Sequence, residues 1–363
     1  MKKILFIVTV AMFMVAQSCQ VSNTRETSEV KPKNIILFIG DGMGATHAQA
    51  AMIANNNHLN LEKCTIIGMS KTSSSDKYIT DSAAGATAIA CGVKTYNGAI
   101  GVNAEKQKVK SVLEYAEEAD LATGLVVTSY VTHATPASFI AHVDTRNDKK
   151  AIAKDFLDVD IDLFIGGGLN DFIEREDGLN IVELLKEKDY QIALKLEELD
   201  NYNNGKIAGL LSGGSMPSVL DGRGDMLTKS TIKAIDILNQ NENGFFLMVE
   251  GSQIDWGAHD NDIESTVSET LDMDNALGKA IEFAEKDGST LVIVTADHET
   301  GGLTILGEDI MSDSTATNFS TGSHTPIMVP VYAYGPQAES FGGIYENTQL
   351  FYKMMDALGL SFN

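Results

Sequence analysis

The alternation of short apolar runs with helical patterns constrains the fold of this chain more than any other feature. Seven runs rich in β-branched and aromatic residues predict strands, and several are apolar at every position, as strands covered on both faces are. The predicted strands are Asn34–Ile39, Thr65–Met69, Thr123–Thr128, Asp160–Ile165, Phe245–Val249, Thr290–Thr295 and Met328–Tyr334. The predicted helices are Ala45–Ala54, Ser82–Cys91, Val109–Glu118, Lys150–Phe156, Ile181–Lys188, Ser230–Leu238, Ile263–Lys286 and Thr348–Leu358. This rhythm predicts an α/β fold, a layered sandwich with a mostly parallel central sheet flanked by helices on both faces.

The first residues indicate export. Lys2 and Lys3 precede an apolar run over residues 4–16, and Cys19 follows shortly after. Residues 1–18 resemble a bacterial lipoprotein signal with Cys19 as the acylated residue, and a plain secretory signal is the alternative. We expect residues 19–31 to form a polar tether. Residues 32–363 then form one domain, with an irregular insertion near residues 189–227 where periodicity is weaker.

The formal net charge of -23 limits the partners of the chain. Such a surface repels nucleic acid and anionic lipid, so we expect no nucleic-acid-binding surface. It also repels phosphate esters, so an enzyme for them needs a locally positive pocket, which metal ions could supply; solubility alone is the plainer explanation of the acidity. Apart from Cys19, the cysteines are Cys64 and Cys91, which form either one disulfide or two buried thiols.

Acidic residues follow the ends of predicted strands. Asp41 comes directly after the first strand, Glu250 ends another, and Asp297 with His298 follows a third. Ligands gather at the carboxyl ends of strands in such sheets. For Asp41 alone, a turn carboxylate that caps the next helix is the competing explanation.

An acid and a histidine four residues apart add to this set. Asp255 and His259 lie on one face if the segment is helical, and this pair of residue types suits zinc. His324, in the loop STGSHTP, would complete the set of ligands that a metal ion needs. If Asp41, Glu250, Asp255 and Asp297 converge, their mutual repulsion raises their pKa values unless divalent cations lie between them. Convergence and metal binding therefore imply each other.

Other residues suit a phosphate group. Ser82 begins a helix of small residues, and a helix N-terminus favours an anion, although an ordinary N-cap explains the same pattern. Thr135 precedes Pro136, which fits the first turn of a helix. Arg146 could bind two phosphate oxygens as a fork or form a surface ion pair. His133 and His142 could be ligands or hydrogen-bonded polar groups, and for His142 we favour the second.

These motifs together resemble those of the alkaline phosphatase family. The strings GDGMG, TDSAAGATA, VKTYNGAIGV, THATPASFIAHV, EGSQIDWGAHDND, TADHETGG and the histidine of STGSHTP occur in the order found in that family, from about Pro32 to the C-terminus. The chain looks most similar to compact bacterial enzymes of the cold-active marine type. The resemblance implies hydrolysis of small phosphate monoesters through a phosphoserine, export to the periplasm, and a homodimer.

The resemblance also implies roles for single residues. Ser82 would be the nucleophile, and Arg146 would clamp the phosphate. Two Zn2+ and one Mg2+ would be held by three sets of side chains: Asp41, Asp297 and His298; Asp255, His259 and His324; and Asp41, Thr135 and Glu250. Two residues near the phosphate depart from the enteric-bacterial form, because His133 replaces an aspartate near the magnesium and Trp256 replaces a lysine.

Two other functions fit parts of this pattern. A phosphodiesterase, sulfatase or phosphoglycerate mutase on the same fold would differ in the bound ester and the nucleophile, and TDSAAGATA does not match the local motif of the sulfatase nucleophile. An anchored phosphate- or metal-binding protein without turnover would share every ligand. Ser82 and the surroundings of Trp256 distinguish it, and a steady-state assay would decide.

Overall fold

The computed structural model describes residues 31–361, which form one compact unit. Its main feature is a ten-stranded sheet in the order β14-β2-β13-β8-β1-β7-β3-β4-β6-β5. The strands of this sheet are β1 (Asn34–Gly40), β2 (Ile66–Lys71), β3 (Ala122–Tyr130), β4 (Leu163–Gly167), β5 (Gln191–Ala193), β6 (Ile207–Leu210), β7 (Phe245–Gly251), β8 (Thr290–Thr295), β13 (Val329–Tyr334) and β14 (Gly343–Glu346). Two small sheets pair β9 (Glu299–Thr300) with β12 (His324–Thr325), and β10 (Leu303–Ile305) with β11 (Thr317–Phe319). The predicted signal peptide and Cys19 lie outside the described residues.

Helices cover the sheet. They are α2 (Ala45–Ala54), α3 (Ser82–Cys91), α4 (Val112–Glu118), α5 (Ala134–Ala137), α6 (Lys149–Asp155), α7 (Leu169–Ile173), α8 (Ile181–Glu187), α9 (Met226–Leu238), α10 (Ile254–His259), α11 (Ile263–Asp287) and α12 (Thr348–Leu358). Three short 3-10 helices are η1 (Asn60–Lys63), η2 (Leu196–Asn201) and η3 (Ala338–Phe341). The predicted bounds of α2, α3 and α12 agree with these.

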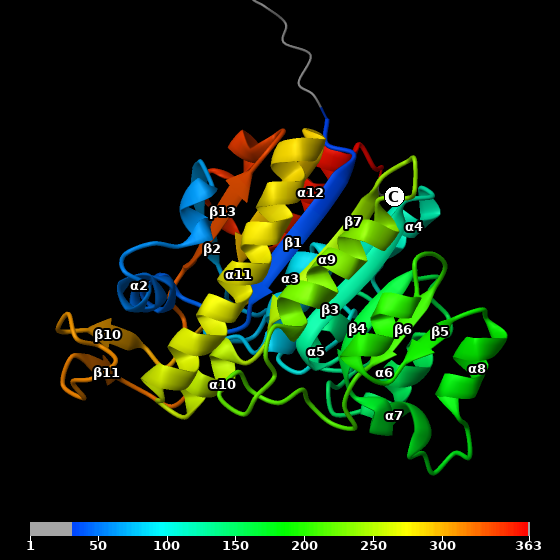
Figure 1. Ribbon diagram of the computed structural model, residues 1–363, viewed down its shortest axis with the longest axis horizontal. Coiled ribbons are helices and arrows are strands. Elements are labelled where there is room, and N and C mark those ends of the chain that lie inside the picture. The colour runs from blue at the N-terminus through cyan, green and yellow to red at the C-terminus, as the bar shows by residue number, and fades with distance from the viewer. Residues whose placement is uncertain (1–30, 362–363) are drawn as a thin grey trace, which may run out of the picture. The chain divides into compact units, whose positions relative to one another are not determined.

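Strand β1 shows why the centre of the sheet is apolar on both faces. Ile35, Leu37 and Ile39 pack into one core with residues of α3, α4 and α12. Ile36 and Phe38 pack into a second core with residues of α2, α9 and α11. Figure 1 shows α9 and α11 crossing in front of the central strands. Since alternate side chains of one strand enter different cores, every position must be apolar, and the predicted layered sandwich is confirmed.

The sheet is mostly parallel, as predicted. Strand β1 pairs in parallel with both β7 and β8, and β7 pairs in parallel with β3. Only β13 runs antiparallel to its neighbours, β2 and β8, within this sheet of the described chain. The carboxyl ends of β1, β3, β7 and β8 therefore meet at one edge, where the site lies.

The segment 189–227 is more regular at its start than we expected. Strands β5 and β6 extend the sheet at one edge, and an irregular stretch follows up to α9. Strands of three or four residues are too short to show a period in the sequence.

Both described cysteines are buried free thiols, so the disulfide alternative is wrong. No helix between residues 31 and 361 is long and apolar enough to cross a membrane.

Candidate active site

Three strands deliver acidic residues to one place. In the sheet register Ile39 lies beside Glu250 on β7 and beside Thr295 on β8. Asp41 and Asp297 follow β1 and β8 within two residues of the strand ends. All three acidic side chains are fully buried. The fold therefore concentrates negative charge where the parallel strands end.

Helix α3 brings Ser82 to these acids. The Asp81 side chain caps the helix by accepting a hydrogen bond from the Ala84 N–H at 3.0 Å, and Ser82 is the first helical residue. Its hydroxyl oxygen lies 3.3 Å from His298 Nε2 and 3.5 Å from Asp41 Oδ1. Ser82 is 2% exposed, so a potential nucleophile stands against buried ligand-type groups.

The first group of potential metal ligands contains Asp41, Asp297 and His298. Their ligand atoms lie within 4.8 Å of one another. His298 Nε2 is 3.3 Å from Asp41 Oδ1 and 3.3 Å from Asp297 Oδ2. Burial lowers the pKa of His298 to about 3, so its imidazole is neutral and can offer a lone pair.

The second group contains Asp255 and His259 of α10 together with His324 of β12. Asp255 Oδ2 lies 3.4 Å from His259 Nε2, and Asp255 Oδ1 lies 3.6 Å from His324 Nε2. The four-residue spacing places Asp255 and His259 on one face of the helix. The pairing of β12 with β9 sets His324 opposite Thr300, next to the first group.

The hydrogen bonds of the imidazoles indicate what these groups are built to hold. His259 Nδ1 lies 2.9 Å from the Gly322 carbonyl oxygen, and His324 Nδ1 lies 2.8 Å from that of Thr80. A carbonyl only accepts, so each Nδ1 carries the proton and each Nε2 carries a lone pair. The two Nε2 atoms nevertheless face each other at 3.0 Å. Two lone pairs repel at this distance unless a cation lies between them, so the donor set fits a metal ion.

The third group surrounds Glu250. Ligand atoms of Asp41, His133 and Glu250 lie within 4.8 Å of one another. Thr135 Oγ1 and both carboxylate oxygens of Glu250 are buried and find no hydrogen-bond partner within residues 31–361. Unpartnered buried oxygens of this kind are the ligands that Mg2+ prefers.

Burial makes these carboxylates costly to ionise. It raises the pKa of Glu250 to about 8. The pKa of Asp41 also rises well above its usual range, first through burial and then through the charges of Asp297 and Asp255. A divalent cation removes both penalties, so the electrostatics and the donor atoms agree.

Arg146 provides the positive side chain of the site. One guanidinium nitrogen donates to Asp81 Oδ2 at 3.2 Å, and the other lies 3.0 Å from His133 Nε2. Because a guanidinium only donates, the His133 nitrogen accepts. Trp256, on α10, lies with its ring centroid 6.1 Å from that of His133. The side chains predicted for phosphate binding are therefore neighbours.

Sequence reasoning missed two residues that connect these groups. Thr300 donates its hydroxyl hydrogen to Asp255 and accepts from His298 Nδ1 at 3.2 Å, which ties the first group to the second. Asp81 caps the helix that begins with Ser82 and accepts from Arg146, so it links these two residues. It also accepts from the Gly98 N–H at 3.1 Å. The position of Asp81 just before Ser82 was a visible signal, whereas Thr300 gave none. His142 lies outside the groups and bonds Glu114 and the Gly101 carbonyl, as we favoured.

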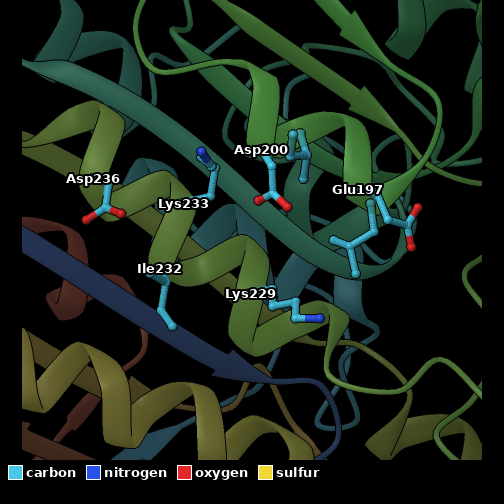
Figure 2. Close-up of a pocket in the computed structure, with 8 residues that line it drawn as sticks. Glu197, Asp200, Lys229, Ile232, Lys233 and Asp236 are labelled. Carbon is cyan, nitrogen blue, oxygen red and sulfur yellow. The ribbon is translucent and has the colours of Figure 1, made fainter.

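A separate surface cavity lies between η2 and α9, with a volume of about 280 Å³ (Figure 2). Charged residues of both signs line it, among them Glu197, Asp200 and Lys229. It shares no residue with the three metal groups, so it takes no part in this site.

Known proteins are similar to this chain in sequence and fold. Alkaline phosphatase 4 of Bacillus subtilis is 36% identical over 92% of this chain and 90% of its own length. The alkaline phosphatase of the Antarctic bacterium TAB5 superposes with a TM-score of 0.87 at 44% identity, covering 92% of this chain and 100% of its own. A histidine-to-aspartate mutant of the TAB5 enzyme, described with Mg bound in the M3 site, gives a TM-score of 0.86 at 43% identity, covering 92% of this chain and 99% of its own. The alkaline phosphatase family model matches residues 32–318. The resemblance seen in the motifs is thus confirmed, and the chain belongs to the alkaline phosphatase family.

Proposed function

We propose that this enzyme hydrolyses phosphate monoesters through a phosphoserine formed on Ser82, releasing an alcohol and then inorganic phosphate. The observation that carries the proposal is the position of the Ser82 hydroxyl, 3.3 Å from the His298 lone pair at the N-terminus of α3. Membership of the alkaline phosphatase family supports the overall reaction.

Three cations complete the site in this proposal. Asp41, Asp297 and His298 hold one zinc ion, and a second is held by Asp255, His259 and His324. Magnesium is held by Asp41, Glu250 and Thr135, with His133 beside them. When bound, these ions stabilise the negative charge on the entering and leaving oxygens and make a serine or water oxygen more acidic.

The residues of the chain then have distinct tasks. Arg146 binds two phosphate oxygens as a fork, while Asp81 keeps its guanidinium oriented. Ser82 Oγ gives up its proton to solvent as it attacks phosphorus in line with the ester oxygen; the P–O bond to the leaving oxygen breaks, and that alkoxide takes up a proton to become the alcohol. Water then attacks the phosphoserine from the vacated side and loses a proton, the Ser82–phosphorus bond breaks, the Ser82 oxygen takes up a proton, and inorganic phosphate forms. Two inversions give net retention at phosphorus.

Location and assembly follow from the same proposal. We infer that the chain is exported to the periplasm, that Cys19 carries the lipid of a membrane anchor, and that the enzyme is a homodimer. The lysines of residues 2–3 and the apolar run before Cys19 support export. The substrates are small phosphate monoesters, because a surface of this net charge disfavours nucleic acid.

A substrate comparison tests the proposal. The purified enzyme is given p-nitrophenyl phosphate, a bis-ester and a sulfate ester, and quench-flow at low pH traps any phosphoenzyme. We expect turnover of the monoester far above the other two and a label on the peptide that contains Ser82. Preference for the bis-ester or the sulfate would contradict the reaction, and phosphate binding without turnover would favour the binding protein.

A further inference from the structure

Lys149 is the first residue of α6, and no motif singles it out. Its ammonium nitrogen lies 4.0 Å from the centroid of the Tyr130 ring, close enough for a cation–π contact. The Tyr130 ring in turn meets the His133 ring edge-on, with centroids 5.2 Å apart. A row of side chains therefore joins Lys149 to the histidine that contacts Arg146.

The charge of Lys149 is not neutralised by an ion pair. No carboxylate of residues 31–361 lies within ion-pair distance of its ammonium nitrogen. The neighbouring Asp148 caps α6 by accepting from the Ala151 N–H, and the following Lys150 pairs with Asp171 at 3.6 Å. Arg146, in contrast, shares its charge with Asp81 at 3.2 Å. In a chain with a formal net charge of -23, such a free cation adds positive charge near an otherwise acidic site.

The contact with Tyr130 fixes how far this charge can lie from the site. The two ring distances keep the ammonium within about 9 Å of the His133 ring, similar to the Debye length of about 8 Å at physiological ionic strength. Trp256, whose ring also lies near that of His133, supplies no charge.

We propose that Lys149, held over the Tyr130 ring, is the second cationic side chain of the phosphate site and attracts the phosphate dianion together with Arg146. The proposal rests on the proposed phosphatase function for its substrate. Lys149 acts through its field and touches no reacting atom. It offsets the repulsion between the acidic surface and the anionic substrate, and it strengthens binding of the inorganic phosphate product by the same amount.

The test is the binding of inorganic phosphate to the metal-loaded enzyme, measured by calorimetry, with kcat/KM for p-nitrophenyl phosphate as a second reading. Both are measured for the wild type, Lys149→Gln and Lys149→Arg at ionic strengths of about 0.02 M and about 0.5 M. Lys154→Gln, at the exposed end of the same helix, is the matched control. Lys229→Gln, in the separate cavity of Figure 2, is a second control.

We expect Lys149→Gln to weaken phosphate binding and lower kcat/KM by about 3- to 5-fold at low salt, as a unit charge and a phosphate dianion at this distance in water predict. The loss should shrink to less than about 2-fold at high salt, and Lys149→Arg should bind phosphate nearly as well as the wild type. Equal binding by Lys149→Gln and the wild type at low salt would overturn the proposal. An equal loss at both salts, shared by Lys149→Arg, would show a packing role against Tyr130 instead.

The two proposals fail separately. If the wild type binds phosphate but does not hydrolyse the monoester, the proposed function fails while the calorimetric comparison still decides the role of Lys149. If the wild type turns over the monoester and Lys149→Gln matches it in every measurement, only the role of Lys149 fails.

Discussion

Gly85 offers a way to disturb the site without changing any ligand. It lies one turn into α3 after Ser82, and a Cβ added there would come 2.9 Å from the carbonyl oxygen of Asp297 and 3.1 Å from its Cβ. Ordinary van der Waals contact needs about 3.5 Å or more, so Gly85→Ala must push α3 and the β8 end apart by about 0.5 Å. Both segments are buried, and neither can swing aside as an exposed side chain could.

Two consequences follow for Gly85→Ala. Overpacking of a buried contact lowers the free energy of unfolding by about 1–3 kcal/mol. A displacement of 1 Å can slow an enzyme about 100-fold, so a shift of half that size should lower kcat/KM by about 10-fold or more. The measurements are kcat/KM for p-nitrophenyl phosphate and denaturant unfolding of the same preparation.

Two other glycines serve as controls for Gly85→Ala. A Cβ at Gly214 would meet no atom within 4 Å, so Gly214→Ala should change neither quantity. A Cβ at Gly124, inside β3, would lie 2.8 Å from Leu238 Cδ1, so Gly124→Ala should lose stability but keep its turnover. Wild-type kcat/KM and stability in Gly85→Ala would refute the claim that this contact sets the distance between Ser82 and the first metal group.

Three further predictions follow from the site and the electrostatics. Ser82→Ala should lose turnover by about 10⁴-fold or more, with no labelled phosphoenzyme and unchanged zinc content; wild-type rates would contradict its role as nucleophile. Arg146→Ala should raise the inhibition constant of inorganic phosphate by about 10- to 100-fold, as expected for lost charge-assisted hydrogen bonds, and unchanged inhibition would exclude the clamp. Burial raises the pKa of Glu117 from 4.5 to about 7, so the folded protein retains a proton that the unfolded chain releases, and stability falls as the pH rises between these values. Glu117→Gln should therefore flatten the pH dependence of unfolding in this window, and an unchanged slope would contradict the assignment.

The sequence allowed prediction of the elements that bury most apolar surface. The central strands are continuous apolar runs because both faces are covered, and such runs stand out without any knowledge of their neighbours. The order of the strands depends on pairings between distant segments, such as β1 with β8, for which the sequence carries no local signal. Strands β5, β6 and β14 were missed because they are only three or four residues long.

The site residues also divide into those that the sequence predicted and those that only the tertiary structure shows. Asp41, Glu250 and Asp297 could be found because each stands at the end of an apolar run, where packing alone does not explain an acidic residue. Spacing paired Asp255 with His259, but the assignment of His298 and His324 to their cations came only from the resemblance. The contacts of Thr300 and Lys149 depend on tertiary structure alone, because a threonine in a turn and a lysine at a helix start are ordinary residues in sequence.

The metal content of the enzyme tests the central claim, that distant segments fold together to hold cations beside the Ser82 hydroxyl. Zinc and magnesium per chain are measured by mass spectrometry together with the monoester hydrolysis rate, before chelation, after chelation and after metal is restored. We predict two zinc ions and one magnesium ion per chain, loss of the rate on chelation, and recovery when both metals return. Full activity in a chain that holds less than one zinc ion would contradict the account.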